Sequence, residues 1–330
     1  MPSSLWDGAR RPQALGTLSA MPGRFAPSPT GPLHVGNLRT ALVAWLLARS
    51  AGDSFRLRIE DLDLVNSSPA HEAAQRADLI ALGIDWDGDV WRQSERFGHY
   101  DDALDTLRRA DLIYECFCTR REIREAAAAP HDDSSLTYPG LCRNLTERQR
   151  ERRREQRPPA LRFRADARAV AFDDVIAGHV VGAAADVVVR RNDGVPAYNL
   201  AVVVDDAAAG IDLVTRGDDL LSSTPSQLAI GAALGAPPPR FAHVPLVIGA
   251  DGRRLTKREG ATTLAELADQ GVGADAVRSA LGVSIGLAEV GERVSADQLA
   301  DRFDVAMLRV HSSGPVHFDE LVALIEQVVG

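Results

Sequence analysis

A loop rich in proline and glycine, RFAPSPTGPLHVGN at residues 24–37, contains the residues best suited to hold a nucleotide. Gly31 and Gly36 allow the backbone to turn sharply or to approach a ligand closely. A helix is expected to begin near Asn37, and its free N–H groups together with the helix dipole favour an anion. His34 lies three residues earlier, where an imidazole could donate to a phosphate oxygen. The loop predicts a nucleotide-phosphate site, although a turn with a histidine cap would have the same spacing.

A single lysine, Lys257, stands among 37 basic residues, and all the others are arginine. It lies in the string RLTKR at residues 254–258, shortly after an Asp-Gly turn at 251–252. One flexible ammonium on a mobile loop can neutralise charge that builds on a leaving pyrophosphate. We expect Lys257 to be functional, and the alternative is a solvated surface lysine.

The three cysteines, Cys116, Cys118 and Cys142, lie within 27 residues of one another. Thiolates at this spacing can hold one Zn²⁺ with bonds of about 2.3 Å, and a closed tetrahedral site needs a fourth ligand. Tyr138 and His131 are the candidates, and ordinary metal chemistry favours His131. The zinc would be structural, because it would pin a segment too small to be stable alone. Buried free cysteines are the alternative.

Composition and charge limit the kinds of protein to which this chain can belong. The chain has 330 residues, of which 45% are hydrophobic and 25% charged, as in globular proteins of two domains with room for a small third. A net charge of −9 argues against a generic DNA-coating protein. Its apolar runs are shorter than the roughly 20 residues of a membrane span, and no secretory signal is recognisable. With an odd number of cysteines, the sequence favours the cytoplasm.

Alternating strand and helix patterns predict an open parallel α/β sheet. Residues 1–21 lack periodicity and are expected to be a disordered extension, with Met21 as an alternative start. The expected helices cover 38–50, 69–82, 95–110 and 220–234, and the expected strands cover 55–60, 186–190, 200–205 and 243–248. After Lys257 only 73 residues remain, with helical patterns at 263–269, 275–281, 296–303 and 318–328.

A change of character at residues 116–164 indicates an insertion into this α/β domain. It contains a run of arginines interleaved with Glu147, Glu151 and Glu155, namely Arg143, Arg148, Arg150, Arg152, Arg153, Arg154 and Arg157. A solvated helix with i,i+4 ion pairs explains such a run. Contact with an RNA backbone explains it equally well, and the sequence leaves both interpretations open.

Five strings of the chain resemble motifs of one enzyme family. The loop at 24–37 resembles the HIGH motif region of class I aminoacyl-tRNA synthetases, in the form found in glutamyl-tRNA synthetases, with Asn37 at the fourth motif position. RIEDLD at 58–63, YNLAVVVDD at 198–206 and RGDDLLSST at 216–224 resemble the same family, and RLTKR resembles its KMSKS loop. The resemblance covers about residues 22–260 in order. It implies a Rossmann-like class I catalytic domain at 22–115 and 165–248, a zinc-bearing insertion at 116–164, and the lysine loop with a short helical C-terminal part at 249–330.

The resemblance also implies the site residues. His34 and Lys257 would be catalytic, and ATP, with Mg²⁺ on its phosphates, would be bound by Pro27, His34, Gly36, Asn37 and Lys257. L-Glutamate would be bound by Arg24, Ser28, Glu60, Tyr198 and Arg216. In that set Arg24 and Arg216 face carboxylates, Tyr198 supplies a hydroxyl and Glu60 meets the ammonium. Two structural alternatives remain open, since Glu60 could pair with Arg58 and Arg216 could pair with an aspartate.

The chain is too short after Lys257 for the anticodon-binding region of a full glutamyl-tRNA synthetase. This length, with the C-x-C and Tyr-x-x-x-Cys pattern, resembles the glutamyl-queuosine tRNA(Asp) synthetases, in which a tyrosine matches Tyr138 as the fourth zinc ligand. The resemblance implies activation of glutamate with ATP without tRNA, then transfer to queuosine in the anticodon of tRNA(Asp). Three other functions fit the same site: a truncated synthetase that charges the 3′ end of tRNA(Glu), a small-molecule glutamyl ligase, and a non-catalytic tRNA-binding paralogue.

Overall fold

A computed structural model describes residues 22–127, 138–166, 168–249, 251–252, 262–311 and 314–329. Its centre is a seven-stranded sheet with the strand order β3-β2-β1-β9-β10-β6-β7. The strands are β1 (Gly23–Phe25), β2 (Phe55–Ile59), β3 (Trp91–Arg92), β6 (Ala169–Asp174), β7 (Gly178–Ala183), β9 (Leu213–Gly217) and β10 (Arg240–Val244). From β3 to β6 all neighbours pair in parallel, and only β6 and β7 are antiparallel. The expected parallel α/β sheet is therefore confirmed.

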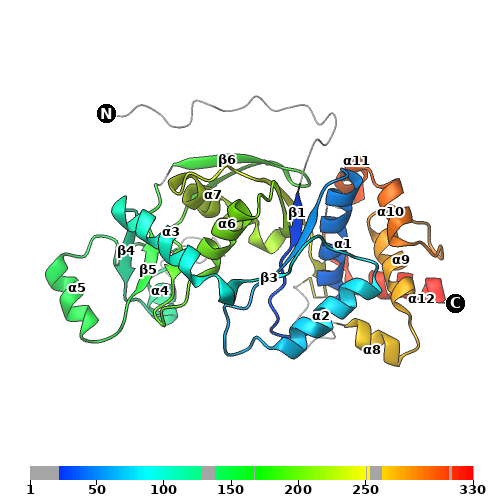
Figure 1. Cartoon of the computed structure of the whole chain (residues 1–330), viewed down its shortest axis with the longest axis horizontal. Coiled ribbons are helices and arrows are strands. Elements are labelled where there is room, and N and C mark those ends of the chain that lie inside the picture. Colours follow the sequence, from blue (N-terminus) through cyan, green and yellow to red (C-terminus); the bar gives the residue numbers. More distant parts are fainter. Residues whose placement is uncertain are drawn as a thin grey trace.

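Helix α1 (Val35–Ser50) lies between this sheet and the C-terminal helices (Figure 1). Its apolar side chains are buried all round and join one core with side chains from both neighbours, such as Leu57 of the sheet and Leu281 of the C-terminal part. A helix buried on all sides has no polar face, which explains its continuous apolar run. α2 (Pro69–Ala81) and α3 (Phe97–Arg109), the latter preceded by the 3-10 helix η1 (Gln93–Glu95), follow within two residues of the positions expected for them.

Residues 200–205 form a helix, and the strand expected there is wrong. They belong to α6 (Tyr198–Ala208), which contacts both α3 and α7 (Thr224–Ala233). The short 3-10 helix η2 (Asp218–Ser223) precedes α7. The three consecutive valines of α6 favour a strand locally, and burial against two helices hides the helical period. The tertiary contacts decide the outcome, and they bring Asp205 and Asp206 into the interior.

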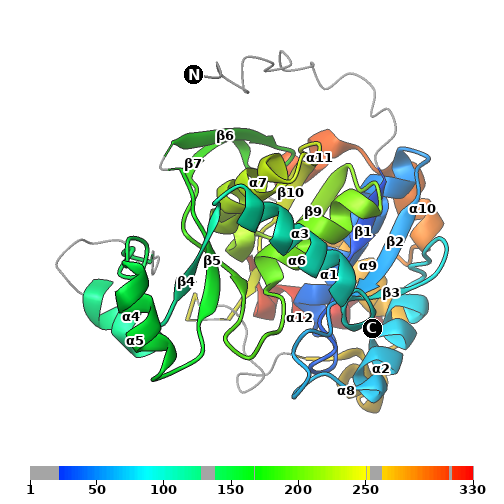
Figure 2. The same cartoon turned by 60° about the vertical axis from the view of Figure 1, so that its left-hand side comes forward.

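A separate antiparallel sheet carries the expected insertion. It consists of β4 (Ile113–Cys116), β5 (Ala160–Phe163) and β8 (Val188–Arg190) in the order β4-β5-β8. Helices α4 (Arg120–Ala127) and α5 (Glu147–Arg154) lie beyond these strands, at one end of the molecule (Figures 1 and 2). The insertion thus shares its sheet with strands that flank it in the sequence.

The C-terminal part is mainly helical, as expected. It contains α8 (Leu264–Asp269), α9 (Ala274–Ser284), α10 (Ala296–Arg302), α11 (Val305–His311) and α12 (Phe318–Val329). A two-stranded parallel pair, β11 (Val247–Ile248) with β12 (Val316–His317), ties it to the end of the main domain. No helix in the described ranges is long and apolar enough to cross a membrane.

Candidate active site

Four neighbouring parallel strands place charged or polar side chains near the same edge of the sheet. Arg58 lies on β2, Arg24 on β1, Arg216 on β9 and His243 on β10, and all four side chains are buried. Ligand sites of open α/β sheets form outside the carboxyl ends of the strands. The sheet therefore brings the expected substrate arginines together from positions about 190 residues apart.

Asp206 on α6 holds two of these arginines. Its carboxylate accepts Nε and Nη2 of Arg24, both at 3.1 Å, and Nη1 of Arg58 at 2.5 Å. Burial alone would raise the pKa of Asp206, but the two guanidinium groups lower it to about 2. Arg24 also donates Nη1 to the carbonyl oxygen of Thr215 at 2.9 Å. One N–H on each terminal nitrogen of Arg24 is left for a ligand.

Glu60 follows β2 and pairs with Arg58. Oε1 of Glu60 accepts Nη2 of Arg58 at 3.0 Å, and the Glu60 amide donates to the carbonyl oxygen of Pro27 at 2.9 Å. Burial raises the pKa of Glu60, while Arg58 opposes the shift. Glu60 therefore does pair with Arg58, which is the structural role left open by the sequence. Its amide also links the end of β2 to the residues that follow β1. In the described part of the chain Oε2 of Glu60 accepts no recorded hydrogen bond, so it could still meet an ammonium.

Arg216 differs from the other site arginines because no acidic residue pairs with it among the described residues. Only 6% of it is exposed, and burial lowers the pKa of its guanidinium. Its short hydrogen bonds go to neutral groups: Gln227 Oε1 at 2.6 Å, Thr224 Oγ1 at 2.8 Å and His243 Nε2 at 3.1 Å. The contacts to Tyr198 Oη and the Leu220 carbonyl are longer, at 3.5 and 3.4 Å. Arg216 is a buried positive charge that a substrate carboxylate could neutralise.

His243 supports Arg216 from the neighbouring strand. Its Nδ1 lies 2.6 Å from Oδ2 of Asp174 on β6, and both side chains are fully buried. With Nδ1 donating to the carboxylate, Nε2 is free to accept from Arg216. Burial lowers the pKa of His243, which favours the neutral ring. Sequence reasoning missed this pair, whose only signal was a histidine at the start of an expected apolar strand.

The loop at 24–37 ends in a reciprocal cap of α1. Nδ1 of His34 accepts the Asn37 amide, and Oδ1 of Asn37 accepts the His34 amide, both at 3.3 Å. Helix α1 begins at Val35, slightly before the expected start. Since Nδ1 of His34 accepts, the neutral ring carries its proton on Nε2, the atom that could donate to a phosphate. A Cβ on Gly36 would lie 3.1 Å from the His34 ring, so a larger residue here would push against the ring that caps the helix.

The remaining expected residues are placed as follows. Ser28 is exposed, and its carbonyl oxygen accepts Nε2 of Gln75 at 3.0 Å, which fixes the loop to α2. Tyr198 begins α6 and contacts Arg216, and burial raises its pKa. Lys257 and His131 lie outside the described residues.

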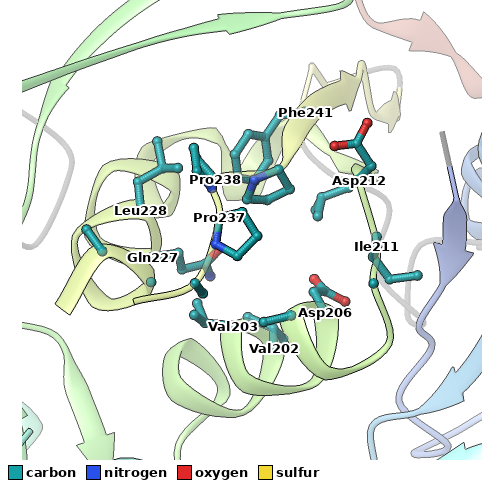
Figure 3. Close-up of a pocket in the computed structure, with 17 residues that line it drawn as sticks. Val202, Val203, Asp206, Ile211, Asp212, Gln227, Leu228, Pro237, Pro238 and Phe241 are labelled. Carbon is teal, nitrogen blue, oxygen red and sulfur yellow. The ribbon is translucent and has the colours of Figure 1, made fainter. Parts of the chain in front are cut away.

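A cavity of about 180 Å³ lies against α6, α7 and the loop that follows α7 (Figure 3). Apolar side chains line most of it, including Val203, Leu228 and Pro237. Its polar lining residues include Asp206 and Gln227, which hold Arg24 and Arg216. This cavity therefore lies next to the side chains that bind Arg24 and Arg216.

The three cysteines form one group that could hold a metal ion. Their sulfur atoms lie within 4.8 Å of one another, with Cys118 and Cys142 at 3.5 Å. A tetrahedral site with bonds of about 2.3 Å has sulfur–sulfur edges of about 3.8 Å, so the group fits. A hydrogen bond from Cys142 lowers the pKa of Cys116 to about 4, against the effect of burial.

Tyr138 completes this cluster. Its Oη lies 3.4 Å from Sγ of Cys116 and 3.7 Å from Sγ of Cys118. The same oxygen accepts the Cys142 amide at 2.7 Å. The Arg162 guanidinium stacks 3.8 Å over the centre of the tyrosine ring. Four potential ligands therefore converge.

Comparison with known proteins identifies the family. A model described as the catalytic domain of class I tRNA synthetases (E and Q) matches residues 21–315. The glutamyl-Q tRNA(Asp) synthetase of Nocardia farcinica is 53% identical over 287 residues, which are 87% of this chain and 90% of that protein. The chain belongs to the glutamyl-Q tRNA(Asp) synthetase family. This membership confirms the class I ligase expected from the motifs.

Longer synthetases are similar over a smaller share of their length. The glutamate–tRNA ligase of Geobacter sulfurreducens is 41% identical over 91% of this chain, but that match spans 64% of the ligase. A solved glutamate tRNA ligase of Elizabethkingia meningosepticum, in complex with its amino acid, superimposes with a TM-score of 0.75 at 29% identity, covering 92% of this chain and 68% of the ligase. The glutamyl-Q tRNA(Asp) synthetase family is thus the better match in length.

Proposed function

We propose that this chain activates L-glutamate with ATP, without requiring tRNA, and transfers the glutamyl group to queuosine in the anticodon of tRNA(Asp). Its membership in the glutamyl-Q tRNA(Asp) synthetase family supports the choice of queuosine in tRNA(Asp) as the acceptor. The assignment of glutamate as the amino acid rests on Arg216, because this residue is a buried cation whose hydrogen-bond partners are all neutral. The side-chain carboxylate of glutamate would neutralise it, whereas the amide of glutamine would leave the charge unpaired.

The first step forms the adenylate. An oxygen of the glutamate α-carboxylate attacks the α-phosphorus of ATP in line, and the bond to pyrophosphate breaks. Nε2 of His34 and the ammonium of Lys257 would stabilise negative charge on the phosphates, and Pro27, Gly36 and Asn37 would line the nucleotide. Mg²⁺ bound with ATP supplies further charge neutralisation.

The remaining substrate residues would orient the amino acid. Arg24 has two N–H groups left to bind a carboxylate, and Oε2 of Glu60 can accept from the ammonium. Ser28 and Tyr198 would add hydroxyl contacts. A hydroxyl of the queuosine ring then attacks the carbonyl carbon of the mixed anhydride and releases AMP. The cytoplasm, which contains both ATP and tRNA, is the compartment that this function implies.

We assign the cysteine group to a structural zinc ion held by Cys116, Cys118, Cys142 and Tyr138. Three thiol sulfurs with one phenol oxygen suit Zn²⁺, and the Cys142 amide already donates to that oxygen. The site ties the end of β4 to the segment before α5. It takes no part in the chemical steps.

Glutamate-dependent ATP–pyrophosphate exchange, run with and without tRNA, tests the first step. Exchange without tRNA is expected, followed by transfer of labelled glutamate to tRNA(Asp) bearing queuosine and not to tRNA(Asp) with guanosine at that position. Exchange that requires tRNA(Glu), with label on its 3′ end, would show a shortened glutamyl-tRNA synthetase instead. No exchange by the folded protein would favour a tRNA-binding paralogue, and exchange with no tRNA acceptor would favour a small-molecule ligase.

A further inference from the structure

Helix α5 carries its arginines on two different faces. On one face, Glu147 accepts from Arg154 at 2.6 Å and from Arg150 at 3.4 Å. Arg154 also pairs with Glu115 of β4 at 2.7 Å. This face is therefore internally neutralised and fastened to the small sheet.

The other face of α5 presents Arg148, Arg152 and Arg153. All three are exposed, and in the part of the chain that the structure describes none of their side chains makes an ion pair or a hydrogen bond. At 100° per residue they cover about 140° of the helix surface. Glu151 and Glu155 lie along one edge of this outer face and are also exposed, yet no pairing with the three arginines is recorded.

The local charge is opposite to that of the whole chain. Residues 147–157 contain six arginines and three glutamates, while the whole chain has a net charge of −9. Three unpaired guanidinium groups close together on one helix face are suited to phosphate oxygens, which they can bind bidentately. The partner that fits this surface is a polyanion with regularly spaced phosphates.

Residues of the cysteine cluster contact the segments directly before and after α5. Before the helix, Leu145 packs against the cluster, and its amide donates to the Cys142 carbonyl oxygen at 3.4 Å. After the helix, Arg157 donates to the carbonyl oxygen of Phe117 and to Glu122, both at 3.1 Å. Phe117 lies between the two cysteines of the C-x-C pattern. The position of the outer face therefore depends on the cysteine cluster.

We propose that the outer face of α5, formed by Arg148, Arg152 and Arg153, docks the phosphate backbone of the tRNA substrate. This inference rests on the proposed function, which requires a tRNA. Both views place α5 at an end of the molecule, away from the carboxyl ends of β1 and β2 (Figures 1 and 2). The contact would position the RNA at a distance from the reacting base and would carry no sequence information.

The triple variant R148Q/R152Q/R153Q tests this surface, because glutamine keeps a polar side chain and a high helix propensity and removes the charge. The matched control is R240Q/R293Q/R302Q, which removes the same charge from exposed arginines that pair locally with Asp212, Asp275 and Glu292. Binding of tRNA(Asp), with and without queuosine, is measured between 50 and 200 mM salt. Each phosphate contact accounts for about a 3.5-fold loss of affinity over this range.

The expected result is that wild-type affinity falls about 40-fold more across the salt range than that of the α5 variant, for both forms of tRNA. Glutamate-dependent pyrophosphate exchange and the melting temperature should be unchanged, and the control should bind like the wild type. Equal affinities and salt slopes in the α5 variant and the wild type would overturn the proposal, as would an equal loss in the control or no tRNA binding by the wild type. Failure of exchange in the wild type would instead count against the proposed function and leave the binding comparison intact.

Discussion

The carboxylate of Asp206 should stabilise the site strongly, because it pairs with two buried arginines. Replacing it by asparagine keeps the side-chain shape and removes the charge that Arg24 and Arg58 share. Both arginine side chains are 4% exposed, so water cannot take over the role of the carboxylate. Breaking a buried ion pair by removing one partner costs about 3–5 kcal/mol. We expect Asp206→Asn to lose stability within that range.

Thermal and chemical unfolding at pH 7 measure this loss. At about 2 °C per kcal/mol for a chain of this size, the melting temperature should fall by roughly 6–10 °C. Asp212→Asn is the matched control, since Asp212 pairs with Arg240 at 2.5 Å but the two side chains are 46% and 42% exposed. Its loss should stay below about 1 kcal/mol.

The pH dependence gives a second test of Asp206. Its pKa is lowered to about 2 in the folded state, below the roughly 3.9 of an unfolded aspartate. The stabilisation is therefore complete above the unfolded value and is lost as the pH falls toward 2. The difference between wild type and variant should be constant from pH 5 to 8. A loss for Asp206→Asn no larger than that for Asp212→Asn would refute the argument that this carboxylate holds the two arginines.

Four further outcomes are expected. Arg216→Gln should raise the KM for glutamate in pyrophosphate exchange about 100-fold, as loss of a charged hydrogen bond implies, with an unchanged or higher melting temperature because no acid loses a partner. Lys257→Ala should slow activation by about two to three decades and leave the fold intact, whereas a matching loss of stability would make the lysine structural. Cys118→Ser should abolish bound zinc and speed hydrogen exchange in residues 116–164, and unchanged metal content would contradict the site. Because folding lowers the pKa of His243, the unfolded chain binds more protons there, and the free energy of unfolding should fall from pH 7 to 5. Denaturant titrations of His243→Gln should lack this contribution to the pH dependence.

The sequence predicts the local parts of this molecule well. The loop between Phe25 and Val35, the strand at 55–59 and the helix at 69–81 are set by proline, glycine and hydrophobic period, which neighbours along the chain determine. The short strand β1, which occupies the start of the expected loop at 24–37, was not predicted. The three cysteines were readable as a group because they lie within 27 residues. The C-terminal helices follow their amphipathic patterns for the same reason.

Contacts between distant segments could not be read in this way. Asp206 meets Arg24 across 182 residues, and His243 meets Asp174 across 69. The contact of Asp206 with Arg24 could not be predicted while residues 200–205 were assigned to a strand. An aspartate at the end of a strand and one inside a helix project in different directions. Only the packing of α6 against α3 and α7 fixes the helix, and only then does Asp206 reach the arginines.

The structure also separates two arginines that the sequence treats alike. Asp206 cancels the charge of Arg24, so we infer that Arg24 contributes chiefly hydrogen-bond geometry to a bound carboxylate. Arg216 keeps its charge, because its short bonds go to an amide, a hydroxyl and a histidine that burial keeps neutral. An amide ligand could satisfy the geometry of Arg24 but not the charge of Arg216. Discrimination between glutamate and glutamine should therefore depend on Arg216 and on the neutrality of His243, and much less on Arg24.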